Sequence, residues 1–242
     1  MQAFSWFNQL GTKMSVAEHT SIDLLLDADD FASPAQGRSS VRASKESPSF
    51  YWVGKRVFDI TVCILLLPLL ALLALVLLVI NPIWNPGTLF FTQRRMGRHC
   101  VPFTIFKFRT MTAAPEVARG PEDPVEADRI TPLGQFMRKT RIDEIPQILN
   151  VLRGEMSIIG PRPDMYEHAV RFLETVPLYH CRHQVRPGIT GFAQVTTGYA
   201  EGSAVTAEKA RKDRIYIRTA CTRMDAIILV RTVRIICASA GR

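Results

Sequence analysis

The sequence lacks any cysteine pattern that would indicate a structural metal or a disulfide framework. Its five cysteines are scattered over 242 residues, their number is odd, and no two are spaced as Cys-x-x-Cys. Zinc sites and disulfide-rich secreted domains show regular cysteine spacing. The sequence therefore favours a chain without disulfides in a reducing compartment.

Other absences exclude further classes of protein. No internal repeat is visible, and no signal-peptide-like run precedes the apolar stretch that begins near residue 57, so we expect no cleaved secretion signal. Aromatic residues make up 9% of the chain. They are not interleaved with basic residues as a stacking platform for nucleic acid would require. We therefore expect no nucleic-acid partner.

Positive charge is present in excess, and it is concentrated near the C-terminus. The formal net charge is +8. Residues 209–242 hold nine basic and two acidic side chains, whereas residues 1–50 hold four basic and six acidic ones. A basic C-terminal region indicates an anionic partner such as phospholipid headgroups or nucleotide phosphates.

The longest apolar run divides the chain into three parts. Residues 60–80 contain no charge, and as a helix they would be about 31 Å long, enough for one hydrocarbon core. We expect a weakly ordered extension over residues 1–50, a membrane helix over 51–84 and a globular domain over 85–242. A spanning helix usually has basic residues on one side only, but this run has them on both, and Pro68 lies inside it. Spanning and re-entrant helices both remain open on this evidence.

The rest of the sequence predicts an α+β fold that is mostly helical. Residues 88–92 and 103–111 read as the two strands of a short hairpin. Residues 133–139 and 145–153 have the periodicity of amphipathic helices, and residues 157–202 are expected to form loops. The basic stretch over residues 218–236 predicts an amphipathic helix, which either lies on a membrane surface or packs on the domain.

The segment Thr140-Arg-Ile-Asp-Glu-Ile-Pro-Gln carries the most chemical information. Asp143 and Glu144 precede Pro146, which favours a helix start, so both carboxylates are expected at a helix N-terminus. Such a site keeps a carboxylate ionised and attracts phosphate. The plainer alternative is that Asp143 is an N-cap and Glu144 a surface residue.

Two further segments contain candidate anion-binding arginines. Arg162 stands between Pro161 and Pro163, which restrain its backbone and aim its guanidinium, a planar fork suited to phosphate. Arg186 opens the Gly-rich stretch Arg186-Pro-Gly-Ile-Thr-Gly, which is flexible enough to approach a nucleotide. A solvated arginine in a turn and a plain hairpin loop are the alternatives.

Taken together, these segments resemble the bacterial sugar transferase family, the monotopic phosphoglycosyl transferases. The resemblance runs from residue 55 to about residue 236 and rests on several long motifs in order. They are Lys55-Arg-Val-Phe-Asp, Pro86-Gly-Thr-Leu-Phe-Phe-Thr-Gln-Arg-Arg, Phe106-Lys-Phe-Arg-Thr-Met, Arg141-Ile-Asp-Glu-Ile-Pro-Gln, Gly154-Glu-Met-Ser-Ile-Ile-Gly-Pro-Arg-Pro, Arg186-Pro-Gly-Ile-Thr-Gly and Asp213-Arg-Ile-Tyr-Ile.

The resemblance implies a fold and a set of site residues. The fold would be a monotopic membrane protein whose N-terminal helix is re-entrant and broken at Pro68, with a small cytoplasmic catalytic domain. Some members have Ser before this proline, where this chain has Leu67. Asp143 would be the nucleophile, and Glu144 would bind Mg²⁺ with it. Residues of the matching motifs would bind substrate phosphate or nucleotide: Lys107, Arg109, Arg141, Pro161, Arg162, Pro163 and Arg186.

The resemblance also implies a reaction. A UDP-sugar would transfer hexose 1-phosphate to a polyprenyl (undecaprenyl) phosphate through a covalent aspartyl intermediate, as the first membrane step of exopolysaccharide or other glycan assembly. The chain would lie at the bacterial inner membrane in contact with lipid, with its catalytic domain facing the cytoplasm. The sugar, and whether the chain forms a homo-oligomer, stay open. The alternative is a non-catalytic, membrane-anchored basic module that binds anionic lipid or nucleic acid.

Overall fold

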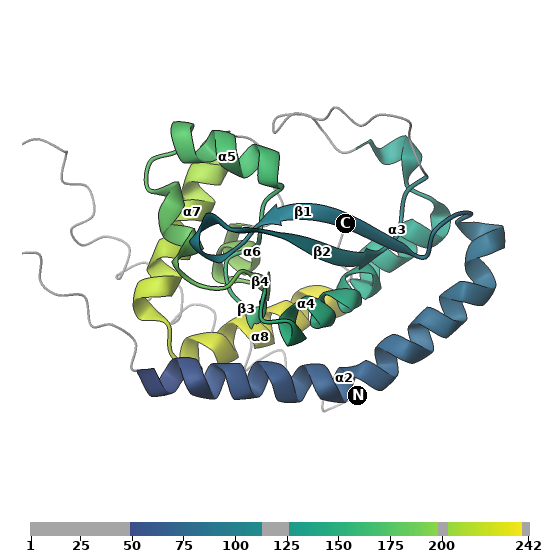
Figure 1. Cartoon of the computed structure of the whole chain (residues 1–242), viewed down its shortest axis with the longest axis horizontal. Coiled ribbons are helices and arrows are strands. Elements are labelled where there is room, and N and C mark those ends of the chain that lie inside the picture. The colour runs from purple at the N-terminus through teal and green to yellow at the C-terminus, as the bar shows by residue number, and fades with distance from the viewer. Residues whose placement is uncertain (1–48, 113–125, 198–202, 239–242) are drawn as a thin grey trace, which may run out of the picture. The chain divides into compact units, whose positions relative to one another are not determined.

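The computed structural model describes residues 49–112, 126–197 and 203–238 (Figure 1). Most of the predicted extension 1–50 therefore lies outside the described residues. Helices predominate, as predicted. In chain order the elements are α2 (Ser49–Trp84), β1 (Phe90–Met96), η1 (Arg98–Cys100), β2 (Pro102–Phe108), η2 (Ala127–Arg129), α3 (Pro132–Thr140), η3 (Ile142–Gln147), α4 (Ile148–Leu152), β3 (Ser157–Ile159), α5 (Tyr166–Thr175), η4 (Tyr179–Gln184), β4 (Gly188–Thr190), α6 (Phe192–Thr197), α7 (Ser203–Thr219) and α8 (Thr222–Cys237).

The predicted β-hairpin is confirmed. Strands β1 and β2 pair antiparallel, with Phe90 opposite Phe108 and Met96 opposite Pro102. The turn between them is tight, since His99 and Cys100 both have a positive φ of about 60°. Ile105 and Phe108 of β2 are buried and belong to the main hydrophobic core cluster, so the hairpin packs against the core.

A second small sheet was not predicted. Strands β3 and β4 pair parallel, with Ser157 opposite Gly188 and Ile159 opposite Thr190. A Cβ at Gly188 would lie 2.1 Å from the backbone nitrogen of Gly160, so only glycine allows the two segments to approach this closely. Gly160 and Gly188 belong to the region 157–202 that was predicted to form loops, but here they allow two strands to lie close together.

Helix α2 packs one face against the domain. The buried residues Cys63, Leu70 and Leu77 recur every seven residues and belong to the same core cluster as Ile148 and Val151 of α4. Partly buried side chains at positions 66, 67, 73, 74 and 80 widen this stripe. The spacing is that of a helix face packed against a neighbouring helix. Pro68 is exposed, on the opposite side from this stripe.

The opposite face of α2 is apolar and exposed. Only 17% of the residues in its most apolar 18-residue stretch are buried. In the described part of the chain, α2 is the one helix that is long and apolar enough to cross a membrane. Its exposed side chains include Leu65, Leu72, Leu75, Val79 and Ile83, each at least 58% exposed. An apolar surface of this extent indicates contact with lipid or protein. Figure 1 shows that α2 is not straight, as expected for a helix that contains Pro68 and Pro82.

Both ends of α2 are bonded to the same domain. Near the start, the Lys55 ammonium and the Tyr51 hydroxyl each donate to Asp225 Oδ2 of α8 at 2.8 Å. At the end, Asn85 Nδ2 donates to the Arg109 carbonyl at 2.7 Å, and Arg109 Nη2 donates back to the Asn85 carbonyl at 2.9 Å. Both ends of the helix, and the buried stripe between them, are therefore attached to one domain.

Candidate active site

A sharp turn brings Asp143 and Glu144 into the interior. Arg141 ends α3 in the left-handed conformation, with φ 61° and ψ 14°, and η3 begins directly after it. Both carboxylates lie in the first turn of η3, so the predicted helix start is confirmed, although the helix is of the 3₁₀ type. The N-cap is Arg141 rather than Asp143. The structure therefore does not support the N-cap alternative for Asp143.

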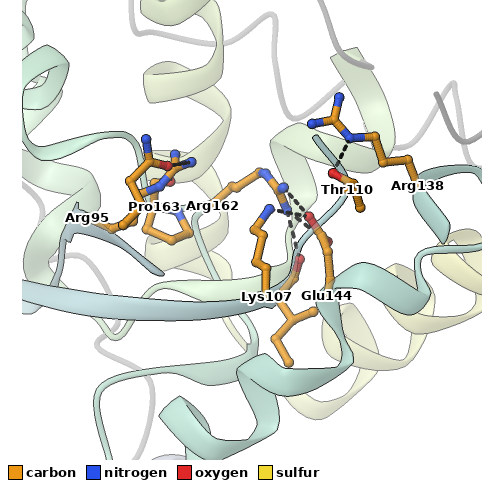
Figure 2. Close-up of polar contacts among 9 residues, drawn as sticks. Arg95, Lys107, Thr110, Arg138, Glu144, Arg162 and Pro163 are labelled. Carbon is orange, nitrogen blue, oxygen red and sulfur yellow. Dashed lines mark hydrogen bonds and ion pairs between the residues drawn. The ribbon is translucent and has the colours of Figure 1, made fainter. Parts of the chain in front are cut away.

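Glu144 is held by two cations. Arg162 Nη1 donates to Glu144 Oε2 at 3.2 Å and Arg162 Nη2 donates to Oε1, while Lys107 Nζ donates to Oε1 at 3.0 Å. Figure 2 shows both side chains pointing at Glu144, one from strand β2 and one from the turn after β3. Burial alone would raise the pKa of Glu144, but Arg162 and Lys107 outweigh it and hold that pKa well below its usual range. Glu144 is ionised at neutral pH.

Asp143 has a different environment from its neighbour. It is 7% exposed. Among the described residues, its buried Oδ1 has no hydrogen-bond partner. Burial, followed by the negative charge of Glu144, raises the pKa of Asp143 to about 6, although Lys107 and Arg162 oppose the shift. An ionised carboxylate with an unsatisfied oxygen is available to react or to bind a cation.

Further cations surround this pair. Arg138 lies near enough to lower the pKa of Asp143, and its Nε donates to Thr110 Oγ1 at 2.9 Å (Figure 2). Arg95 is half-buried close to Arg162, and the pKa of Arg95 falls to about 10, first because its guanidinium is desolvated and then because of this second positive charge. Cations gathered around two carboxylates form a site that favours an additional anion.

A cavity of about 230 Å³ opens beside these groups. Glu144 and Arg141 form part of its wall, and apolar side chains form most of the remainder. Helix α2 contributes Val62 and Leu66, and α8 contributes residues that include Leu229. The cavity thus joins a charged end at η3 to an apolar end between the first and last described helices, which suits an amphipathic ligand.

The structure separates two of the predicted site residues from the carboxylates. Arg109 donates to the carbonyl of Asn85, and its guanidinium also fills the space beside Gly87, so in this structure it fixes the end of α2. Arg186 Nε donates to the Gly154 carbonyl at 2.8 Å. Pro161 and Pro163 flank Arg162 as predicted, and Arg141 borders the cavity. Their roles toward substrate stay predictions.

Comparisons with known proteins show the family of this chain. The family model described as "Bacterial sugar transferase" matches residues 50–239.

The chain belongs to the bacterial sugar transferase family.

Three relatives illustrate the family. The chain is 39% identical, over 196 residues, to the UDP-N-acetylgalactosamine-undecaprenyl-phosphate N-acetylgalactosaminephosphotransferase of Aeromonas hydrophila; the match covers 81% of this chain and 46% of that one. It is 39% identical, over 184 residues, to the UDP-glucose:undecaprenyl-phosphate glucose-1-phosphate transferase of Caulobacter vibrioides, covering 74% and 68%. It is 36% identical to the exopolysaccharide production protein PSS of Rhizobium leguminosarum, covering 74% and 92%. The chain thus spans about half of the first relative.

The carboxylates of this family member suit a magnesium ion. Mg²⁺ in proteins prefers oxygen ligands and is commonly held by one or two carboxylates together with substrate phosphates. Asp143 offers an unsatisfied buried oxygen. Glu144 lies beside it, but its oxygens already accept from Arg162 and Lys107. No cluster of three or more metal-ligating side chains occurs within the described ranges, so substrate phosphate would have to complete the coordination.

Sequence reasoning missed a buried network behind the site. Arg182, Asp164 and Asp213 come together although they lie on three separate segments. Arg182 and Asp213 are 4% and 1% exposed. Nothing in the local pattern of η4 or α7 marks these charges as internal. The one signal was that Asp213 opens one of the matched motifs.

Proposed function

We propose that the chain transfers a hexose 1-phosphate from a UDP-sugar to undecaprenyl phosphate. The observation that carries this proposal is Asp143, a buried carboxylate with an unsatisfied oxygen in the midst of Lys107, Arg162 and Arg138. The printed names of the Aeromonas and Caulobacter relatives describe a reaction of this type. The name of the Rhizobium relative supports a role in exopolysaccharide assembly.

The first step uses Asp143 as the nucleophile. An Asp143 oxygen attacks the β-phosphorus of the UDP-sugar, a new P–O bond to the carboxylate forms, and the bond between that phosphorus and the bridging oxygen breaks. UMP leaves with the electron pair of the broken bond. The sugar phosphate stays on the enzyme as an acyl phosphate ester. Dividing one displacement between two anionic substrates into two steps avoids bringing both to the site together.

The second step restores the enzyme. An oxygen of undecaprenyl phosphate attacks the phosphorus of the ester, and the P–O bond to Asp143 breaks. The products are the lipid diphosphate sugar and the free Asp143 carboxylate. Arg162 and Lys107 offset negative charge in both steps, because both lie beside the carboxylate pair and lower the pKa of Asp143.

The two carboxylates have different roles in this scheme. The raised pKa of Asp143 leaves a carboxylate that is ionised at neutral pH yet poorly neutralised, as suits a nucleophile. Glu144 positions Arg162 and Lys107 through its ion pairs. Asp143 and Glu144 would also hold Mg²⁺, which when bound offsets charge on the pyrophosphate and stabilises the leaving phosphate.

The cavity beside Glu144 suits the lipid acceptor. Its wall includes Arg141 and Glu144, the chain neighbour of Asp143, and its apolar part includes residues of α2 and α8. A polyprenyl phosphate needs an apolar surface and a cationic site close together, and this cavity provides that combination.

The contacts of α2 support a re-entrant membrane helix at the cytoplasmic side of the inner membrane. Lys55 and Asn85 tie the two ends to one domain, and the exposed face between them is apolar. A single-pass helix would separate its ends by the full bilayer, about 30 Å of hydrocarbon. Because a nucleotide sugar is cytoplasmic, the domain and both flanks of α2 would lie on that side.

Release of UMP tests the proposed activity. The protein in membranes or detergent is supplied with undecaprenyl phosphate, Mg²⁺ and, in turn, UDP-glucose, UDP-galactose and their N-acetylated counterparts. With at least one of these donors the protein should release UMP. Repeated turnover should require the lipid acceptor, and Asp143→Asn should abolish UMP release. A wild-type protein that binds membranes but releases no UMP from any of these donors would support the non-catalytic alternative.

A further inference from the structure

The turn that carries Arg162 is held by its carbonyl groups. Proline cannot donate a backbone hydrogen bond, so a Pro-Arg-Pro segment can be fixed by its neighbours mainly through its oxygens. Each of four consecutive carbonyls accepts one hydrogen bond. The donors are Gly188 N to Pro161 O at 2.9 Å, Arg182 Nη2 to Arg162 O at 2.8 Å, Arg95 Nη1 to Pro163 O at 3.1 Å and Met96 N to Asp164 O at 3.1 Å.

Two of the four donors are arginine side chains, the half-buried Arg95 and the buried Arg182, and Arg182 bonds Arg162 itself. Arg182 lies on η4, 20 residues from Arg162 in sequence. One guanidinium nitrogen of Arg182 donates to the carbonyl of Arg162 and forms an ion pair with Asp213 Oδ2 at 2.9 Å. The other donates to Asp164 Oδ2. The guanidinium therefore contacts all three partners from one orientation: it donates to Arg162 O and to Asp164, and it forms an ion pair with Asp213, whose oxygens accept no hydrogen bond from the described residues.

The carboxylates on either side keep Arg182 in this orientation. Asp164 also accepts a hydrogen bond from the Tyr179 hydroxyl, and Asp213 is fixed on α7. Burial lowers the pKa of Arg182, but Asp164 and Asp213 outweigh that effect and raise it, so the guanidinium stays charged. A charged donor on a carbonyl makes a stronger hydrogen bond than a neutral one.

We infer that Arg182, oriented by Asp164 and Asp213, is a positioning residue that fixes the backbone of Arg162 so that its guanidinium reaches Glu144 and the substrate phosphate. This inference rests on the proposed function, because it requires Arg162 to act on phosphate. A small shift of a phosphate-binding group is costly to catalysis. The competing explanation is that the buried ion pairs only join η4 to α7.

A double-mutant cycle distinguishes these explanations. Arg182→Lys keeps the positive charge between Asp164 and Asp213, but one ammonium cannot reproduce the fork that also reaches Arg162 O. We expect kcat for UMP release to fall about tenfold, the size of one charge-assisted hydrogen bond. Arg162→Ala alone is expected to lose only roughly 10–150-fold, so its activity should still be measurable. In that background Arg182→Lys should have little further effect.

Arg98→Lys is the matched control. Arg98 Nε also donates to a backbone carbonyl of η4, that of Gln184 at 3.1 Å, but it does not contact the turn in any bond that the structure records. This variant should keep wild-type kinetics in both backgrounds. Thermal unfolding midpoints of all the variants show whether each one is folded.

The outcomes separate the inference from the function on which it rests. An equal loss from Arg182→Lys in both backgrounds, or no loss in either, would overturn the positioning role. If Arg182→Lys does not fold, Arg95→Lys replaces it in the cycle, because Arg95 donates to the next carbonyl, that of Pro163. A fall in kcat of the same size with and without the Arg162 side chain would again overturn the positioning role. Full activity of Arg162→Ala alone would instead remove the proposed role of Arg162.

Discussion

At the scale of single residues, Asp143 and Glu144 show how two adjacent carboxylates acquire opposite acidities. Glu144 accepts from Arg162 and Lys107, which lower its pKa, whereas burial raises the pKa of Asp143 to about 6. The sequence predicted the pair and its place at a helix start. It could not predict which carboxylate the cations would bind, since Lys107 and Arg162 come from distant segments.

The acidity of Asp143 predicts a pH dependence for the first step. The nucleophile must be ionised, and its pKa is raised to about 6, so the rate of UMP release in the absence of acceptor should fall as the pH drops through about 6. Arg162 lowers this pKa, so Arg162→Ala should shift the acidic limb to higher pH. Rapid-quench measurement of UMP between pH 5 and 8 provides the test. An unchanged limb in Arg162→Ala would contradict the account.

Arg162 is predicted to contribute to phosphate binding through its fork. Loss of a bidentate, charge-assisted contact typically costs about 1.5–3 kcal/mol, or roughly 10–150-fold in kcat/KM. Arg162→Ala should show a loss in this range. Arg162→Lys should also be impaired, because lysine has no fork. Steady-state assays with varied UDP-sugar measure both, and an unchanged kcat/KM in Arg162→Ala would mean that the turn is only structural.

At the scale of elements, the sequence predicted types better than faces or pairings. The hairpin and the amphipathic helix α3 follow from local periodicity, and both are present. The packed stripe of α2 could not be predicted, because residues 60–80 are apolar all around and no periodicity separates the face on α4 from the exposed one. Strands β3 and β4 have only three residues each and pair across 31 positions, so no local signal marks them.

The helix predicted from residue 145 to 153 is shorter than expected. The structure has the 3₁₀ helix η3 over Ile142–Gln147, followed by α4 over only Ile148–Leu152. Pro146 lies inside η3 and has no N–H to donate, which interrupts a regular α-helical pattern there. This 3₁₀ segment carries both carboxylates and packs against strand β2.

The anchor between α2 and α8 is predicted to be important for stability. Asp225 accepts from Lys55, Tyr51 and Tyr216. Asp225→Ala leaves the Lys55 ammonium buried and uncompensated, which typically costs about 3–5 kcal/mol. The unfolding midpoint in detergent should therefore fall markedly. Asp128→Ala on the exposed η2 is the control and should leave the midpoint nearly unchanged. Equal midpoints for the two variants would show that this anchor is dispensable.

At the scale of the whole molecule, the attachment of both ends of α2 to one domain predicts that both flanks of the helix lie on the same side of the membrane. Single cysteines at positions 45 and 98, in a chain whose five own cysteines are replaced, should both resist a membrane-impermeant reagent in intact cells. Both should react after permeabilisation. Positive charge on both flanks agrees with this arrangement, because neither flank would have to be translocated. Labelling of position 45 from outside would show that the helix spans the membrane.

Intact-mass analysis can detect whether Asp143 becomes covalently bonded to a sugar phosphate. The wild-type protein and Asp143→Asn are each incubated with the UDP-sugar that supports UMP release, without lipid acceptor. The account predicts an added hexose phosphate on the wild type only. Peptide mapping should locate the adduct at Asp143, and undecaprenyl phosphate should remove it. Unimpaired sugar transfer by Asp143→Asn, or turnover by the wild type with no adduct at Asp143, would contradict the account.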